Sequence, residues 1–255
     1  MVVKVIEPEW KRVPETLDRV RKRIGEVLAF GEVRGFRKAG PLPTRWKDHL
    51  DKLLPHPRSV KPIVHHPAMP YDAVPELYRK LVATDSIAEL CLAFTILTAV
   101  RSQESRGARW DEIDLKAGIW EVPPIRMKRK RPHRVPLSAE VLKLIKRLPR
   151  NDEYLFSISG TKPIVPMSLR KALHRHGGDA FTVHGMRSAF RDWGGERTSA
   201  PREILEVALA HALGDQTEAA YARGDLLEKR RKVMQQWATH CASPTARGNV
   251  LKLAG

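Results

Sequence analysis

Residues 87–100 read IAELCLAFTILTAV, and Leu90 to Val100 is the longest apolar run of the chain. Apolar side chains recur three and four residues apart and also occupy the remaining faces, which predicts a helix buried on nearly all sides. The run is much shorter than the roughly 20 residues that span a bilayer. We therefore expect the central helix of a soluble domain, followed directly by Arg101.

Other helical and strand patterns surround this stretch. Apolar residues at helical spacing predict further helices over residues 74–82, 139–148, 168–176, 184–196, 202–212, 217–222 and 226–240. Glycine and proline separate short, partly alternating stretches, which predict a small antiparallel sheet over residues 110–115, 119–122 and 134–137. The predicted fold class is therefore mainly α with a small antiparallel β-sheet.

The first part of the chain has a different pattern. A basic amphipathic helix is predicted between Pro14 and Gly35, and a short helical pattern runs from Trp46 to Leu54. The proline-rich residues 55–70 are typical of an extended linker. We expect a partial helical domain over residues 1–58 and a linker over residues 59–70. A main domain over residues 71–242 and a loose tail over residues 243–255 would follow.

The composition points to a polyanionic partner. The chain has 255 residues, with 46 Lys and Arg against 29 Asp and Glu, and a formal net charge of +17. Double-stranded DNA fits this excess, because each cation that neutralises a phosphate releases a counterion. Cys91 and Cys241 are too far apart in the sequence for a zinc knuckle, and no export signal is present. We expect a cytoplasmic DNA-binding protein without a membrane anchor.

Two arginines stand where a phosphate could bind. Arg101 follows the buried helix, where its guanidinium can hold a phosphate through two parallel hydrogen bonds or form an ion pair with Glu104. His184 and Arg187 share one face at the start of a predicted helix, where backbone N–H groups favour an anion. An ordinary polar helix face has the same spacing. From these residues alone, a phosphate site and a structural role both stay open.

The remaining candidates lie in a basic loop and near the C-terminus. Lys128 stands between two predicted strands, in a loop that also contains Arg129, Lys130 and Arg131. A lysine there can protonate a leaving group or only contact DNA, and spacing does not choose between Lys128 and Lys130. His211 ends a predicted helix and Tyr221 follows it. A tyrosine is more often a packed aromatic than a nucleophile, unless arginines stabilise its phenolate.

Taken in chain order, these motifs resemble the tyrosine recombinase, or phage integrase, family. The resemblance is carried by five groups of residues. They are TAVR at 98–101 with Glu104 after it, MK at 127–128 before HRVPLS at 133–138, HGMR at 184–187, LAH at 209–211 and AY at 220–221. The stretches FRDW and RGDLLEKRR, at residues 190–193 and 223–231, are most similar to integrases of P4-like prophages and genomic islands. The similarity covers nearly the whole chain. It implies a recombinase catalytic domain preceded by part of a helical core-binding domain.

The resemblance also implies roles for the candidate residues. The scissile DNA phosphate would be bound by Arg101, His184, Arg187 and His211. Lys128 would protonate the 5′ oxygen, and Tyr221 would attack phosphorus to form a 3′-phosphotyrosyl link. Because this link stores the energy of the broken bond, strands can be rejoined without a metal or a nucleotide cofactor. Glu104 would support the arginine and histidine groups.

Partners follow from the same resemblance. DNA attachment sites would be bound by a dimer or tetramer, with Arg129, Lys130 and Arg131 contacting DNA. An excisionase or a host DNA-bending protein would be further partners, and a tRNA gene would be the target. Met1 corresponds to the middle of the core-binding domain, so we expect no arm-binding domain and an incomplete clamp around DNA. Ala99 replaces a glycine that is frequent in the wider family.

Three alternative functions stay open at this stage. The first is a catalytically silent DNA-binding remnant of an integrase. The second is a type IB topoisomerase-like enzyme that nicks and rejoins DNA without exchanging strands. The third and most distant is a metal-dependent nuclease, which only His65, His66 and the other scattered histidines suggest.

Overall fold

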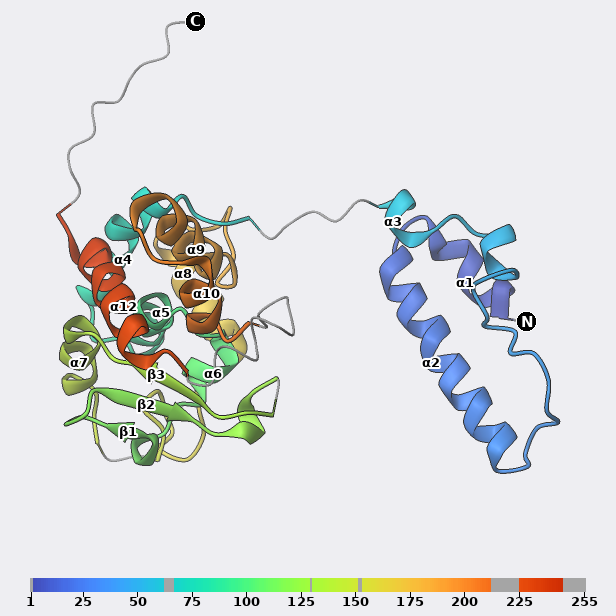
Figure 1. Cartoon of the computed structure of the whole chain (residues 1–255), viewed down its shortest axis with the longest axis horizontal. Coiled ribbons are helices and arrows are strands. Elements are labelled where there is room, and N and C mark those ends of the chain that lie inside the picture. The colour runs from blue at the N-terminus through green and yellow to red at the C-terminus, as the bar shows by residue number, and fades with distance from the viewer. Residues whose placement is uncertain (1, 62–66, 129, 151–152, 212–224, 245–255) are drawn as a thin grey trace, which may run out of the picture. The chain divides into compact units, whose positions relative to one another are not determined.

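The chain divides into two compact units, Met1–His65 and His66–Gly255. A computed structural model describes residues 2–61, 67–128, 130–150, 153–211 and 225–244. Each unit has its own hydrophobic core, and Figure 1 shows the helices and strands that enclose it. The predicted helix over residues 217–222 and most of the predicted tail lie outside the described residues.

The first unit consists mainly of α1 (Val2–Trp10) and α2 (Pro14–Val33). One face of α1 and the segment that returns to it supply the buried side chains of Val2, Ile6, Trp10, Leu50 and Leu54. The indole N–H of Trp10 donates to the carbonyl of Pro55 at 2.8 Å, which holds that segment against α1. Pro14 fits the first turn of α2 because the N–H it lacks would have no partner within the helix.

The first unit differs from the sequence predictions in three places. The sequence patterns did not predict α1, which contains Pro8 in its interior. The helical pattern from Trp46 to Leu54 forms only a 3-10 turn at Leu50–Lys52. There the Asp51 carboxylate accepts hydrogen bonds from two preceding backbone N–H groups, and this local bonding competes with a helix. A short helix, α3 (Pro57–Val60), occupies part of the stretch that was expected to be extended.

The second unit is built around α5 (Ile87–Thr98). Every residue from Glu89 to Thr98 is buried, and α5 packs against α4, α6, α7, α8, α9 and α12 (Figure 1). Those helices span Val74–Val82, Ser102–Arg106, Ala139–Lys146, Pro166–Arg175, Gly185–Arg197 and Leu227–Ala242, and α10 spans Arg202–Ala208. The predicted central helix is confirmed. The sequence did not predict α6, because a helix this short has little periodicity.

A three-stranded antiparallel sheet lies beside the helices. Its strands are β1 (Ile113–Asp114), β2 (Ile119–Val122) and β3 (His133–Pro136), in the order β1-β2-β3. Trp120 pairs with Val135, and both are buried. The outer strand β3 packs against α12. The predicted fold class, mainly α with a small antiparallel sheet, is confirmed.

The end of α5 determines where Arg101 lies. Ala99 caps the helix in the left-handed region, with φ 52° and ψ 21°, a conformation that costs a non-glycine residue about 1 kcal/mol. Arg101 follows in an extended conformation and begins α6. The chain therefore turns sharply between the buried helix and the first candidate arginine.

Candidate active site

Arg187 connects the ends of helices that are far apart in the sequence. It lies in the first turn of α9 and is only 4% exposed. Its Nη1 donates to the carbonyl of Ala99, and its Nη2 donates to the carbonyl of Leu209 at 2.6 Å. These carbonyls belong to the residues that end α5 and α10. One buried guanidinium thus fixes the position of both helix ends.

Arg101 lies at the start of α6 and is paired with Glu104. The buried Glu104 carboxylate accepts the backbone N–H of Arg101 at 2.8 Å and its Nη1 at 2.9 Å. Nη2 of Arg101 donates to the carbonyl of Ala210 at 3.4 Å. The ion pair orients a guanidinium that is still 26% exposed. Arg101 therefore forms a structural ion pair with Glu104 and still presents part of its charged group to solvent.

His211 lies between Arg187 and a carboxylate. Its Nε2 is 3.0 Å from Nη2 of Arg187, and its Nδ1 is 2.7 Å from Oε2 of Glu206. Its backbone N–H also donates to the carbonyl of Glu206 at 2.9 Å. The sequence patterns did not single out Glu206. The one feature of the sequence that could have indicated Glu206 is its place five residues before His211. The left-handed turn at Ala210 brings His211 back to Glu206.

We refer to Arg101, Glu104, Arg187, Glu206 and His211 as the arginine–histidine cluster. Burial, and then the charge of Arg101, lowers the pKa of Arg187 to about 10, so that it stays charged at neutral pH. Burial also lowers the pKa of His211, with Arg187 and Arg101 acting in the same direction and Glu206 opposing them. The cluster therefore combines two cations with a neutral imidazole at the end of α10, and it is the two guanidinium groups that suit an anion.

The structure places the other candidate residues as follows. His184 is exposed and immediately precedes α9, and its carbonyl accepts the backbone N–H of Arg187 at 3.1 Å. Lys128 is exposed in the connection between β2 and β3, and among the described residues it forms no hydrogen bond or ion pair with the cluster. Lys130 and Arg131 are exposed in the same connection. Arg129 and Tyr221 lie outside the described residues.

A second histidine lies close to the cluster but is buried. His133, at the start of β3, is 8% exposed, and its Nε2 has no hydrogen-bond partner among the described residues. Burial, and then the charge of Arg230, lowers the pKa of His133 to about 4, while Arg187 and Arg101 act in the same direction. His133 is therefore neutral at physiological pH. The sequence patterns placed it at the end of the basic turn, just before the predicted strand over residues 134–137, and gave it no role of its own.

Two arginines hold Asp225, the first described residue after position 211. Arg134 on β3 donates Nε and Nη2 to the Asp225 carboxylate, both at 2.8 Å. Arg230 on α12 is fully buried, lies 3.0 Å from the same carboxylate through Nη2, and donates Nε to the Asp225 carbonyl at 2.6 Å. Asp225 is thus fixed against both β3 and α12.

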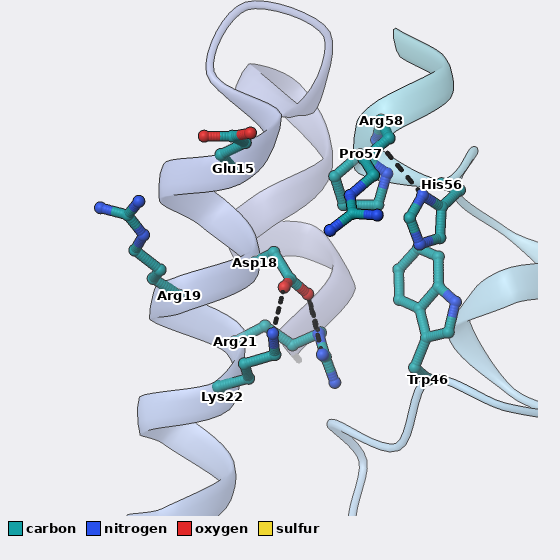
Figure 2. Close-up of a pocket in the computed structure, with 9 residues that line it drawn as sticks. All are labelled: Glu15, Asp18, Arg19, Arg21, Lys22, Trp46, His56, Pro57 and Arg58. Atoms are coloured by element: carbon teal, nitrogen blue, oxygen red, sulfur yellow. Dashed lines mark hydrogen bonds and ion pairs between the residues drawn. The ribbon is translucent and has the colours of Figure 1, made fainter. Parts of the chain in front are cut away.

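The first unit carries a basic hollow of its own, with a volume of about 560 Å³ (Figure 2). It is lined by Glu15, Asp18, Arg19, Arg21, Lys22, Trp46, His56, Pro57 and Arg58. Arg21 and Lys22 each lie 2.8 Å from Asp18, and the Arg21 guanidinium lies 5.4 Å from the ring centre of Trp46. After Asp18 and Glu15 are balanced, the hollow keeps an excess of positive charge.

The described part of the chain contains no group of three or more His, Cys, Asp or Glu side chains that could hold a metal ion. None of the helices it contains is both long and apolar enough to cross a bilayer.

Comparison with known protein sequences identifies a family. The model of the phage integrase family matches residues 69–226. Prophage integrase IntA of Escherichia coli strain K12 is 34% identical over 247 residues, covering 93% of this chain and 57% of that protein. The integrase of Enterobacteria phage P4 is 32% identical over 199 residues, covering 69% of this chain and 45% of that protein. The chain thus spans about half the length of these relatives.

Solved structures with the same fold include lambda integrase. Residues 75–356 of lambda integrase, solved as a dimer bound to a COC′ core site, match with a TM-score of 0.57 at 15% identity, covering 88% of this chain and 77% of that one. A lambda integrase tetramer bound to a Holliday junction matches with a TM-score of 0.58 at 12% identity, covering 84% and 64%. The match to the family model and the 34% identity to IntA confirm the family that the motifs indicated: the chain belongs to the phage integrase family.

Proposed function

We propose that this chain carries the catalytic part of a site-specific DNA recombinase, which cuts and rejoins DNA strands through a 3′-phosphotyrosyl intermediate. The observation that carries the proposal is the convergence of Arg101, Arg187 and His211 at the ends of α5 and α10. Membership of the phage integrase family supports it. In the proposed reaction, the three side chains hold the scissile phosphate while Tyr221 acts as the nucleophile.

The cluster would stabilise negative charge that develops on phosphorus. When a phenol attacks a phosphodiester, the non-bridging oxygens gain charge in the transition state. Donors that are already oriented stabilise that charge without reorganising, and their effect is larger in a partly buried site. Arg187 is fixed by two carbonyls and Arg101 by Glu104, so both guanidinium groups are oriented in advance. Loss of one such donor costs about 3 kcal/mol in the transition state.

Proton transfers complete the proposed cycle. As Tyr221 attacks, its oxygen forms a bond to phosphorus, its phenolic proton passes to solvent water, and the P–O bond to the 5′ oxygen breaks. We assign protonation of that oxygen to Lys128, which is exposed on the connection between β2 and β3. His184, one helical turn before Arg187, is assigned to the phosphate as well. In the reverse step, a 5′ hydroxyl attacks the phosphotyrosyl bond and releases Tyr221, so each cleavage is balanced by one joining step.

The proposed partner is double-stranded DNA. The net charge of +17 and the exposed Lys130 and Arg131 support binding to its phosphates. The basic hollow of the first unit supports a second contact with DNA, and we assign residues 1–58 to a core-binding domain and residues 71–242 to the catalytic domain. Assembly as a dimer or tetramer is proposed because lambda integrase has been solved in both forms. An excisionase or a DNA-bending host protein, and a cytoplasmic location, belong to the same proposal.

Covalent capture tests this function without knowledge of the attachment site. Duplexes with a randomised core and a nick just 3′ of the expected cleavage position lose the short 5′-hydroxyl strand after cleavage, which traps the adduct. We expect a denaturant-resistant protein–DNA adduct that Tyr221→Phe abolishes. Tyr154→Phe serves as the matched control, because it removes a phenolic hydroxyl away from the cluster and should leave the adduct unchanged.

The alternatives predict different results in the same assays. A silent remnant binds the duplexes in a salt-sensitive manner but yields no adduct with any sequence. A topoisomerase-like enzyme forms the adduct and relaxes a supercoiled plasmid, yet yields no recombinant when two captured sites are placed on one plasmid. Adduct formation together with recombinants supports the proposal.

A further inference from the structure

The hydrogen bonds of His211 define which of its nitrogens carries the proton. A guanidinium can only donate hydrogen bonds, so Nε2, which lies 3.0 Å from Nη2 of Arg187, is the acceptor. A carboxylate can only accept, so Nδ1, which lies 2.7 Å from Oε2 of Glu206, carries the proton. In the arrangement seen here, His211 is therefore a neutral imidazole protonated on Nδ1.

This tautomer does not suit a phosphate ligand. A phosphate oxygen is also an acceptor, so it would face the lone pair of Nε2 rather than an N–H group. For His211 to donate to the phosphate, Nε2 must first gain a proton from solvent. The ring would then be an imidazolium within reach of two other cations, Arg187 and Arg101, and only a nearby anion makes that charge tolerable.

Glu206 is placed to serve both forms of the ring. Its Oε2 accepts Nδ1–H in the neutral form and keeps accepting it when Nε2 is protonated. Its Oε1 is 3.0 Å from Nε of Arg191 and 3.9 Å from Nε of Arg202, and its side chain is only 14% exposed. These ion pairs hold the carboxylate in place at the end of α10.

We infer that Glu206 is a positioning residue: it fixes the orientation and tautomer of His211, and it balances the charge when Nε2 takes up one proton as the cluster binds a DNA phosphate. The inference rests on the proposed function, which places the phosphate at the cluster. The charged groups that face His211 or its partner are Arg187 and Arg191 on α9, Arg101 on α6, and Arg202 and Glu206 on α10; Glu104 is paired with Arg101.

The first test needs no DNA and no activity. The 15N chemical shifts of the His211 ring report which nitrogen is protonated, and His211→Asn assigns the signals. We expect the Nδ1–H form in the unmodified protein and in Glu206→Gln, whose amide oxygen still accepts the hydrogen bond. In Glu206→Ala we expect a mixture of tautomers. An Nε2–H ring in the unmodified protein, or no change in Glu206→Ala, would overturn the inference.

The second test measures proton uptake on binding. Calorimetry is carried out above neutral pH in buffers of different ionisation enthalpy, with the Tyr221→Phe protein. The DNA is the duplex recovered by covalent capture, or a duplex of random sequence if none is recovered. We expect uptake approaching one proton per bound duplex in this background, clearly less with Glu206→Gln added, and none at this site with His211→Asn added. Equal uptake in all three proteins would contradict the inference.

A third test separates positioning from a general structural effect. With the duplex saturated by protein, the rate of adduct formation should fall about tenfold per pH unit once Nε2 loses its proton in the complex. Glu206→Gln should move this decline to lower pH, because the charge that stabilises the imidazolium is gone. Glu206→Ala should slow the reaction about tenfold to hundredfold at every pH, by analogy with the loss of other groups that orient a functional histidine. Glu203→Gln, an exposed neighbour on α10, is the control that should do neither.

The outcomes also distinguish this inference from the proposed function. If no duplex ever yields an adduct but the ring is the Nδ1–H tautomer and depends on Glu206, the proposed function fails and the positioning by Glu206 stands. If adducts form and depend on Tyr221, but their yield responds to pH in the same way in the unmodified protein and in Glu206→Gln, the function stands and the inference fails.

Discussion

Arg187 and Arg230 are both buried arginines, but their surroundings differ. Arg230 on α12 faces the Asp225 carboxylate at 3.0 Å and donates to the carbonyls of Asp225 and Arg134, both at 2.6 Å. Arg187 on α9 donates to two carbonyls and a histidine, and among the described residues it forms no direct ion pair with a carboxylate; Glu104 and Glu206 act on its charge only from a greater distance. A buried charge without a counterion is costly. The comparison indicates that Arg230 stabilises the fold, whereas Arg187 has no carboxylate in direct contact, which agrees with the proposed role of its charge in binding an anionic ligand.

The largest expected effect comes from Arg230. We predict that Arg230→Met lowers the free energy of unfolding by about 4 kcal/mol, because two carbonyls lose their donor and Asp225 loses one of its two partners. Denaturant titration followed by circular dichroism measures this loss. Arg231→Met, on the same helix but with a side chain that is only partly buried, is the control. A loss below about 1 kcal/mol would show that the pair adds nothing to the stability of the fold.

Substitution of Arg187 should affect adduct formation strongly and the free energy of unfolding only slightly, in contrast to substitution of Arg230. We predict that Arg187→Met raises the barrier to adduct formation by about 3 kcal/mol, or roughly a hundredfold in rate. The free energy of unfolding should change by no more than about 1 kcal/mol, because removal of a buried charge that has no direct ion pair offsets the loss of two hydrogen bonds. If activity persists while stability collapses, Arg187 is a structural residue and the comparison fails.

His133 lies near both arginines and adds a pH dependence to stability. The unfolded state binds a proton at the ordinary pKa of about 6.5, whereas burial holds the pKa of folded His133 at about 4. The protonation of His133 therefore does not reduce the free energy of unfolding above pH 6.5. As the pH falls from 6.5 to 4, it lowers the free energy of unfolding by about 3 kcal/mol in total. Denaturant titrations at several pH values should show this decline. His133→Gln should flatten it, and an unchanged slope would place the titrating group elsewhere.

The smallest effect is expected at Ala99, whose carbonyl accepts Nη1 of Arg187. We predict that Ala99→Gly raises the free energy of unfolding by up to about 1 kcal/mol, because glycine adopts a φ of 52° without strain. Adduct formation should not change, since the carbonyl stays in place. Thermal unfolding at matched pH measures the difference. A clear destabilisation would mean that the methyl group of Ala99 contributes more through packing than its backbone conformation costs.

Local patterns in the sequence predicted much of this architecture. The apolar run ending at Val100 predicted α5, and short stretches bounded by glycine and proline predicted the sheet. The spacing of Arg101 and Glu104 indicated a pair that the structure contains. The pattern from Trp46 to Leu54 was misleading because the side chain of Asp51 bonds to the backbone, a local competition that periodicity does not register.

Contacts that depend on a backbone reversal or on the packing of elements could not be predicted in the same way. Glu206 reaches His211 only because the chain reverses at Ala210, where φ is 50°. Arg230 donates to the carbonyl of Arg134 on β3, a contact that depends on how α12 packs on the sheet. His133 follows strand alternation, and only its burial near charged groups makes it unusual. The roles of Lys128, His184 and Tyr221 stay predictions, and the choice between Lys128 and Lys130 depends on the position of bound DNA.

Locating the covalent bond tests the central claim most directly. The adduct from the capture experiment is digested with nuclease and protease, and mass spectrometry identifies the peptide that carries the remaining nucleotide. We predict a 3′-phosphotyrosyl bond at Tyr221 in the unmodified protein and a yield reduced about a hundredfold in Arg187→Met. A nucleotide on any other residue, or no modified peptide from any duplex, would contradict the account.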